Sequence, residues 1–248
     1  MIIGLNGYIG SGKDVVGKLI QAGHEEGFDS VSHNLGHVVD NYVPDKHNEI
    51  QIQKWAAKLK QICGTILNVD PKLFEDQEYK KTFLPEMWNT FQVQFGDGAT
   101  TGPGFITLEE AERFEAHERV ALSWLPELKT EIIEKKLTVR EFLQKMGTDA
   151  CRDNIHSNIW VNALMSDYTP EKKWIITDTR FPNEAKAIKD AGGIMIRINR
   201  GVHDTTKMHI SETALDDYEY DYVIDNNGTY AELLTQVFGI YVATGLAT

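Results

Sequence analysis

Short apolar runs alternate with amphipathic segments at the start of the chain, and this pattern predicts its first elements. Residues 2–5 form an apolar run that ends at Asn6-Gly7, which predicts a buried strand. Residues 13–26 carry apolar side chains at helical spacing and predict a helix. The same spacing over 49–67 predicts a second helix. Residues 27–48 show no regular pattern, so no element is assigned there.

The middle of the chain is more polar and its elements are less regular. Residues 96–104 contain four glycines and a proline, which predicts a loop. A capping-box pattern at the start of 107–135 predicts an acidic helical segment. A further helix is expected from Thr138, with Gly147 ending it.

The last third of the chain has the clearest alternation of strands and helices. The expected elements are a strand at 174–177, a helix from Pro182 to Gly192-Gly193, strands at 194–198 and 222–224, and a helix at 229–239. Strands that alternate with helices imply a parallel sheet covered on both faces. We therefore predict an α/β fold.

Composition changes the range of expected partners. The 248 residues carry 25 Lys and Arg against 37 Asp and Glu, a formal charge of −12. Such a surface repels nucleic acid and anionic lipid, so neither is an expected partner. The start of the chain shows no leader, and no apolar run reaches membrane-helix length, which predicts a cytoplasmic protein. Cys63 and Cys151 are far apart and are expected to be free thiols.

Residues 7–14 carry the clearest chemistry. Gly7-Tyr8-Ile9-Gly10-Ser11-Gly12-Lys13-Asp14 fits the pattern G-x-x-x-x-G-K, with aspartate where serine or threonine is usual. Glycines let the backbone N–H groups point at phosphate oxygens, and the next helix directs its positive end there. Lys13 adds a cation for the phosphates. The loop predicts a nucleoside triphosphate site, with Asp14 holding a magnesium-bound water or substrate.

The strand at 174–177 leads into the second group of candidate residues, Asp178, Arg180 and Glu184. No acid follows Asp178, unlike in motor ATPases, and the guanine motif N-K-x-D is absent. Both observations favour a phosphotransferase over a hydrolase. Asp178 is placed to orient Mg²⁺ water or a substrate hydroxyl. Arg180 and Glu184 are expected to share a helix face, as acceptor-binding groups or as a surface ion pair.

Residues 140–160 add recognition groups. Arg140 and Arg152 are candidates for binding phosphate in a bidentate manner. Trp160 is a candidate for stacking on a base, although a core position is the more usual role of a lone tryptophan.

Several motifs together resemble the deoxynucleoside monophosphate kinases of tailed bacteriophages. They are the loop G-x-x-x-x-G-K-D, Leu143-Gln144-x-x-Gly147-Thr148-Asp149 with Trp160, Asp178-Thr179-Arg180 with Glu184, His209-Ile210-Ser211-Glu212, and Val223 to Gly228. The resemblance is weak over 27–50 and 86–135, which look like insertions. It implies one kinase domain over 1–248, an inserted acceptor-binding helical region at about 40–135, and a lid at about 198–212.

The resemblance also implies an activity and its residues. The family has the P-loop nucleoside-monophosphate-kinase fold and transfers the γ-phosphoryl group of ATP, with Mg²⁺, to a deoxynucleoside monophosphate. For a phage-encoded chain this implies the host cytoplasm and a supply of dNTPs for DNA synthesis. ATP would be bound by Gly10, Ser11, Gly12, Lys13, Asp14, Val15, Asn226 and Gly228. The acceptor would be bound by Lys60, Arg140, Gly147, Thr148, Arg152, Trp160, Asp178, Arg180 and Glu184. Lys13, Arg140, Asp178 and Arg180 would be catalytic, Asp14 and Asp178 would approach magnesium through water, and Arg197 and Arg200 would serve the lid.

Two alternatives remain open at this point. One is a P-loop kinase of another small metabolite, such as dephospho-coenzyme A. The other is an ATP-binding regulatory module without transferase activity. Apolar stripes on several predicted helices would suit a homodimer.

Overall fold

The computed structural model describes residues 1–95, 99–101, 104, 107–121, 129–201 and 213–246. The chain divides into two compact units, one formed by residues 1–59 with 155–248 and the other by 60–154. The expectation of one kinase domain with an insertion at about 40–135 stays a prediction. Among the described residues, no helix combines the length and the hydrophobicity needed to cross a bilayer.

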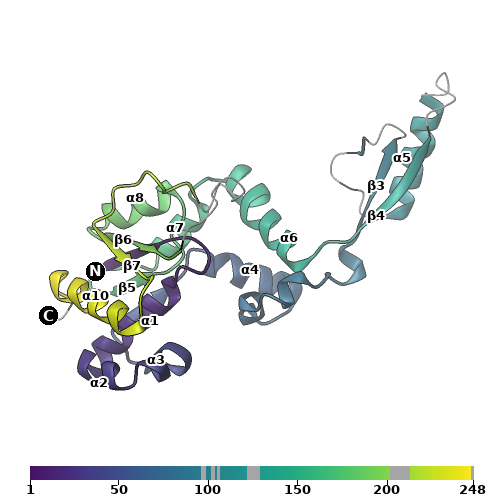
Figure 1. The fold of residues 1–248 in the computed structure, drawn as a ribbon. Helices are drawn as coiled ribbons and strands as arrows, with labels where there is room; N and C mark the ends of the chain where they lie inside the picture. The colour runs from purple at the N-terminus through teal and green to yellow at the C-terminus, as the bar shows by residue number, and fades with distance from the viewer. Residues whose placement is uncertain (96–98, 102–103, 105–106, 122–128, 202–212, 247–248) are drawn as a thin grey trace. The chain divides into compact units, whose positions relative to one another are not determined.

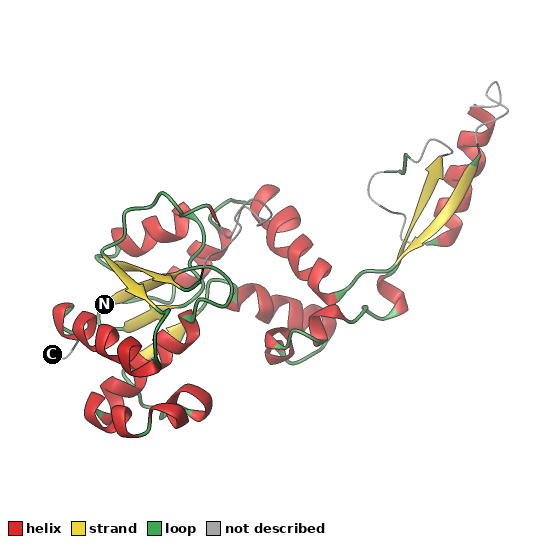
Figure 2. Ribbon diagram, in the orientation of Figure 1, coloured by secondary structure: helices red, strands yellow, loops and turns green. Residues whose placement is uncertain are grey.

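A parallel sheet forms the centre of the first unit (Figure 2). Its strands, in spatial order, are β2 (Ile50–Gln53), β5 (Lys173–Ile176), β1 (Ile2–Asn6), β6 (Ile194–Asn199) and β7 (Tyr222–Asp225). Every neighbouring pair in this sheet is parallel. Helices connect β1 to β2, β2 to β5 and β5 to β6, which is the connection that parallel strands require. The predicted α/β fold is confirmed.

Side chains on successive strand residues point to opposite faces of the sheet and build two cores. On one face, Ile3 and Leu5 belong to a core with α1 (Lys13–Glu26) and α10 (Tyr230–Ala243). Ile2 belongs to the other core, with α7 (Ile159–Met165) and α8 (Pro182–Asp190). Figure 1 shows α8 and α10 on opposite sides of the strands. Because both faces are covered, the strands read as apolar runs rather than as alternating patterns.

Gly4 lies at the middle of the central strand, paired with Ile176 on one side and Met195 on the other. A Cβ atom at this position would stand 2.5 Å from both Ile188 Cδ1 and Met195 Sδ. Carbon atoms in contact are about 3.5–4.0 Å apart. The absent side chain therefore allows α8 to pack closely on β1.

The second unit joins short helices to a two-stranded ribbon. Its elements are η1 (Pro71–Glu75), η2 (Tyr79–Lys81), η3 (Glu86–Trp88), β3 (Thr90–Phe95), α5 (Leu108–Ala121), β4 (Thr130–Lys135), α6 (Val139–Gln144) and the π-helical η4 (Lys145–Asp153). The helix α4 (Ala57–Leu67) begins in the first unit and continues into the second. Strands β3 and β4 pair antiparallel, with Val93 opposite Ile132.

Three sequence predictions were wrong at their boundaries. The helix expected at 49–67 is strand β2 followed by α4. The acidic helix expected at 107–135 ends at Ala121, and β4 follows at 130–135. The helix from Thr138 has its predicted capping box, but Gly147 does not end the helical stretch, because it lies buried inside η4. Apolar residues at spacings of two and of three to four overlap in short segments, so periodicity alone did not separate strand from helix.

The structure also contains helices that no pattern indicated. Residues 27–48 hold α2 (Phe28–His33) and α3 (Leu35–Asn41), whose buried residues are Val31, Val38 and Val39. Each helix is too short to show two turns of apolar spacing, and tertiary packing on α1 stabilises them.

Candidate active site

The loop of residues 7–14 connects the carboxyl end of β1 to the first turn of α1. The Ser11 amide donates to the Tyr8 carbonyl oxygen at 3.1 Å, which closes the loop on itself. Gly10 and Gly12 have φ angles of 78° and 97°, a region that favours glycine. This phosphate loop, as residues 7–14 are called below, lies at the edge of the sheet where α/β proteins bind ligands.

Lys13 is the first residue of α1 and its side chain folds back over the loop. Its Nζ donates to the carbonyl oxygens of Gly7 at 2.6 Å and Tyr8 at 2.8 Å. The ammonium group is therefore held at the loop by main-chain oxygen atoms. Its role as a phosphate-binding cation stays a prediction.

Ser11 has a polar atom that the described residues do not satisfy. Its side chain is fully buried, and Oγ has no hydrogen-bond partner within the described part of the chain. A buried hydroxyl without a partner costs free energy, so such atoms in loops often mark a ligand or ordered water.

Asn226 supports the backbone of the phosphate loop through a hydrogen bond. Its Nδ2 donates to the Ser11 carbonyl oxygen at 2.8 Å, and its own amide donates to the Asn199 carbonyl oxygen at 2.8 Å. A Cβ atom on Gly12 would come within 2.4 Å of Asn226 Nδ2. Asn226 thus supports the loop backbone, and the predicted contact of Asn226 and Gly228 with ATP stays a prediction.

Asp178 lies just after strand β5 and anchors the turn that follows β2. Its carboxylate accepts hydrogen bonds from the amides of Trp55 at 2.8 Å and Ala56 at 3.3 Å. Burial raises the pKa of Asp178, while the two amides and the nearby Lys54 and Arg180 oppose this rise. Each oxygen atom of the Asp178 carboxylate thus accepts one main-chain hydrogen bond, from Trp55 or from Ala56.

Asp14 has two partners that sequence reasoning missed. Thr177 Oγ1 donates to Asp14 Oδ1 at 2.9 Å, and Lys54 Nζ lies 3.5 Å from the same oxygen atom. Thr177 and Lys54 each follow the last residue of a strand, β5 and β2. Lys54 was missed because its segment reads as part of a helix, which hides its place at the strand end.

Glu184 caps the start of α8. Its Oε2 accepts hydrogen bonds from the amides of Arg180 at 2.7 Å and Phe181 at 3.1 Å, and the residue is 3% exposed. Arg180 precedes α8, which starts at Pro182, so the two residues do not share a helix face as expected. The Glu184 carboxylate instead fixes the backbone that carries the Arg180 side chain.

Arg197 is buried within β6, at 8% exposure. It donates to Asn6 Oδ1 and, at 3.1 Å, to Asp216 Oδ1. Its guanidinium lies 4.5 Å from the centre of the Tyr8 ring, and Tyr8 OH donates to Asp216 at 2.8 Å. Arg197 thus ties the phosphate loop to the sheet. Arg200 is exposed, and residues 202–212 of the predicted lid lie outside the described residues, so the lid roles stay predictions.

The remaining predicted residues are described within their own units. Trp160 lies on α7 in the first unit and is 6% exposed. In the second unit, Lys60 Nζ pairs with Glu75 at 2.6 Å, and Arg140 donates to Gln77 at 3.1 Å. Gly147, Thr148 and Arg152 all lie in η4. The first unit brings together the phosphate loop, Asp178, Arg180 and Glu184, while the acceptor residues of the second unit stay predictions.

The oxygen atoms around Asp14 are of the kind that magnesium binds. The described residues contain no group of three or more His, Cys, Asp or Glu side chains that could hold a metal ion. A magnesium ion bound with ATP needs few protein ligands, because phosphates and water supply most of its oxygen donors. Asp14 and Thr177 place a carboxylate and a hydroxyl together at the end of the phosphate loop. These hard oxygen atoms fit Mg²⁺ with a triphosphate.

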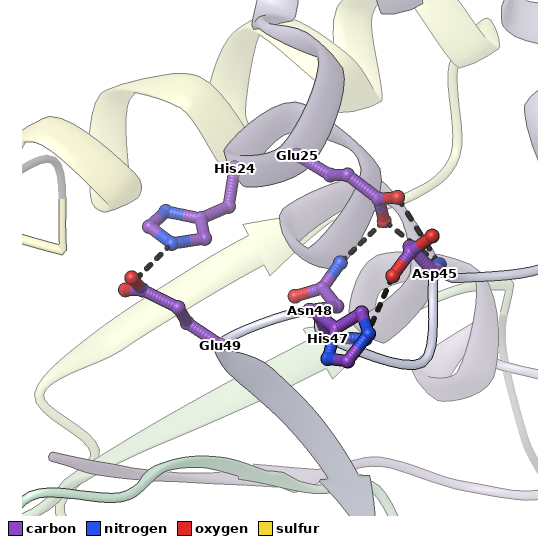
Figure 3. A pocket seen from close by; sticks show the side chains of 6 residues that line it. All are labelled: His24, Glu25, Asp45, His47, Asn48 and Glu49. Carbon is purple, nitrogen blue, oxygen red and sulfur yellow. Dashed lines mark hydrogen bonds and ion pairs between the residues drawn. The ribbon is translucent and has the colours of Figure 1, made fainter.

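A hollow of about 380 Å³ lies where α1 ends and β2 begins (Figure 3). It is lined by His24, Glu25, Asp45, His47, Asn48 and Glu49. Its polar groups contact one another: His24 lies 3.4 Å from Glu49, and Glu25 accepts from the Asp45 amide at 3.1 Å. Because α1 runs away from the phosphate loop, this hollow lies at the amino edge of the sheet and is not part of the candidate site.

Comparison with known proteins gives three similar chains of viral origin. A putative deoxynucleotide monophosphate kinase of Acanthamoeba polyphaga mimivirus is 36% identical over 115 residues, covering 40% of this chain and 59% of the relative. Deoxynucleotide monophosphate kinases of Enterobacteria phage T4 and Escherichia phage RB69 are 30% and 28% identical over 110 and 105 residues. These matches cover 42% and 40% of this chain, and 46% and 43% of the relatives. The chain thus spans about half the length of the curated relatives it matches.

The family model described as deoxynucleotide monophosphate kinase matches residues 1–237, nearly the whole chain. The match includes the phosphate loop, Asp178, Arg180 and Asn226, which the structure places in the first unit. The chain belongs to the deoxynucleotide monophosphate kinase family.

Proposed function

We propose that this protein transfers the γ-phosphoryl group of ATP to a deoxynucleoside 5′-monophosphate, giving a deoxynucleoside diphosphate and ADP. The observation that carries the proposal is the phosphate loop with Lys13 at the carboxyl edge of the sheet, in a chain of this family. The unsatisfied Ser11 hydroxyl adds support, because it lies within the same loop. Such a reaction would supply precursors for DNA synthesis.

The acceptor phosphate determines what the protein must do. A phosphate monoester has a second pKa near 6 and is largely dianionic at neutral pH, so it needs no strong general base. The protein must instead hold two anions together in line and offset their charge. Lys13 would exchange the carbonyl oxygens of Gly7 and Tyr8 for phosphate oxygens. Arg180, fixed through its backbone by Glu184, would bind the acceptor phosphate.

Magnesium is part of the proposal. Asp14 and Asp178 would hold it through bound water, and Thr177 would orient the Asp14 carboxylate. The ion, when bound, supplies positive charge beside the transferred phosphoryl group.

Further acceptor contacts are proposed in the second unit. Lys60, Arg140 and Arg152 carry the cations for this role, and Gly147 and Thr148 lie on the same η4 segment as Arg152. Lys60 and Arg140 currently contact Glu75 and Gln77, so acceptor binding requires that these side chains change partners.

The proposal includes ATP and the acceptor as ligands, no nucleic-acid or membrane partner, and the host cytoplasm for a phage-encoded chain. It also includes a homodimer, because Ile62 and Ile66, one turn apart on α4, are 47% and 43% exposed. Light scattering of the purified protein measures its mass in solution, and a monomer at micromolar concentration would exclude the homodimer.

A coupled assay of ADP production tests the activity. It uses ATP, Mg²⁺ and, separately, each of the common dNMPs, the NMPs and dephospho-coenzyme A. Turnover with at least one dNMP, and less with the corresponding NMP, supports the proposal. Turnover only with dephospho-coenzyme A would show that the acceptor is this metabolite and not a deoxynucleotide. Binding of ATP without turnover on any acceptor would indicate a regulatory module.

A further inference from the structure

Asp14 introduces a charge problem into the phosphate loop. The position that follows the loop lysine usually carries a hydroxyl, and here it carries a carboxylate. The Asp14 side chain is 68% exposed, beside the loop that is to receive a triphosphate. A carboxylate at this position repels a polyanion, so the loop needs a compensating cation in addition to Lys13.

The structure contains a cation in the required place. Lys54 Nζ lies 3.5 Å from Asp14 Oδ1, and its side chain is 30% exposed. Lys54 follows β2, in which Gln53 pairs with Ile176 of β5. Since Thr177 follows Ile176, the two residues that contact Asp14 come from adjacent strand ends. Their positions are set by the register of the sheet rather than by the phosphate loop.

Position 14 lacks the usual hydroxyl, but Thr177 places a hydroxyl beside it from a different element. Thr177 Oγ1 donates to Asp14 Oδ1 at 2.9 Å, and Thr177 is 2% exposed. A hydroxyl and an ammonium group on the same carboxylate oxygen fix the Asp14 rotamer and leave Oδ2 for other ligands. The three side chains together supply the oxygen donor and the neutral charge that a serine or threonine at position 14 would supply alone.

We propose that Lys54 is a positioning residue of the nucleotide site: it holds and neutralises Asp14, so that a phosphate loop carrying aspartate binds a nucleoside triphosphate. The inference rests on the proposed function in one respect, namely that this loop binds ATP. The proposal predicts that Lys54 affects ATP binding because Asp14 is charged. Replacing Asp14 with the usual serine should therefore remove most of the need for Lys54.

A double-mutant cycle tests this dependence. The dissociation constant of ATP, with Mg²⁺, is measured by calorimetry for the wild type, Lys54→Met, Asp14→Ser and the double variant. Lys54→Met should weaken ATP binding by about tenfold or more, as expected for loss of a charge-assisted contact. In the Asp14→Ser background the same change should weaken binding by less than about threefold. Lys54→Arg, which keeps the charge, should remain close to the wild type.

Lys173→Met is the matched control. Lys173 is the first residue of β5 and lies at the amino end of the strand, away from the phosphate loop. Its Nζ lies 3.2 Å from Glu49 in a similar ion pair. Its side chain is 24% exposed. The control should bind ATP as the wild type does. Melting temperatures of all variants identify any loss of folding, and Lys54→Gln, which also removes the charge, replaces Lys54→Met in the cycle if the latter unfolds.

The outcomes separate the inference from the proposed function. Equal weakening by Lys54→Met in both Asp14 backgrounds, or no weakening in either, overturns the inference and leaves the kinase proposal intact. ATP binding with the expected cycle but no phosphoryl transfer to any acceptor supports the inference and overturns the proposed activity. A wild type that binds no ATP overturns both.

Discussion

Asn226 donates its side-chain amide to the carbonyl oxygen of Ser11 at 2.8 Å, across 215 positions of sequence. The loop before the last helix therefore supports the phosphate loop directly. We expect Asn226→Ala to lower the free energy of unfolding by about 1–3 kcal/mol, because the buried carbonyl loses its donor. The KM for ATP should rise as well, since the loop loses its support. Urea denaturation and steady-state kinetics measure the two effects, and an unchanged KM would contradict a role in shaping the loop.

Lys13→Ala should reduce kcat by about 100-fold or more and leave the fold intact. The Lys13 ammonium donates to the loop carbonyls of Gly7 and Tyr8, and Lys13 belongs to neither apolar core, so its removal leaves both cores packed. Lys18→Ala is a suitable control, because Lys18 lies on the same helix and donates to the Val39 carbonyl at 3.1 Å. Circular dichroism confirms folding, and turnover near the wild-type rate would exclude the assigned role of Lys13.

Arg180→Ala should impair use of the acceptor more than use of ATP. Glu184 accepts a hydrogen bond from the Arg180 main-chain amide, which the substitution retains, so the start of α8 keeps this cap in the variant. We expect the KM for the dNMP to rise by about tenfold or more, with a smaller change for ATP. Lys186→Ala on α8, whose lysine pairs with Asp190 at 2.6 Å, controls for surface charge. Equal effects on both substrates would argue against acceptor binding by Arg180.

Asp221 should make stability depend on pH in the acid range. Burial alone would raise its pKa, but Lys189 and the Met195 amide, at 2.9 Å and 2.7 Å, lower it below the usual value. A carboxyl with a lowered pKa stabilises the fold above its unfolded pKa, near 4, and this contribution is lost as the pH falls through the folded value.

We therefore expect Asp221→Asn to lower the melting temperature at pH 7 and to have less effect below about pH 4. Thermal melts of the variant and the wild type from pH 7 to pH 3 measure the difference. A gap between the two proteins that stays constant over this range would show that Asp221 acts through its shape rather than its charge.

The sequence predicted the first unit's sheet well and its edge poorly. Strands β1, β5, β6 and β7 are short apolar runs with breakers at their ends, and they were all predicted. Strand β2 contains only Ile50, Gln51, Ile52 and Gln53, and its apolar residues also fit the spacing of α4. Misreading β2 as helix hid the strand end on which Lys54 lies. A prediction of an edge strand needs its partner, and that partner, β5, is more than 100 residues away in sequence.

In the candidate site, too, the sequence predicted the residues of local motifs but not their partners from distant segments. Lys13 and Asp14 were found because a local motif places them at the start of α1, and Asp178 because it closely follows the apolar run of β5. The partners of the loop residues come from separate elements that only the folded sheet brings together: Thr177 and Lys54 contact Asp14, and Asn226 contacts Ser11. The buried contacts of Arg197 with Asn6 and Asp216 depend on tertiary structure that no local pattern reports, and its proposed lid role stays a prediction.

Gly4 allows close packing beside the candidate site. With no side chain at the middle of β1, Ile188 of α8 and Met195 of β6 reach the strand itself, and Thr179 Oγ1 lies 3.3 Å from where a Cβ would stand. Thr179 lies on the segment between β5 and α8, and its carbonyl oxygen also accepts a hydrogen bond from Asn6 of β1 at 2.8 Å, so this segment packs directly on the strand that leads into the phosphate loop. A methyl group at position 4 would press on Ile188, Met195 and Thr179. We expect it to shift the segment that carries Arg180 relative to the phosphate loop, so that Gly4→Ala would disturb the proposed site from a position that contacts no ligand.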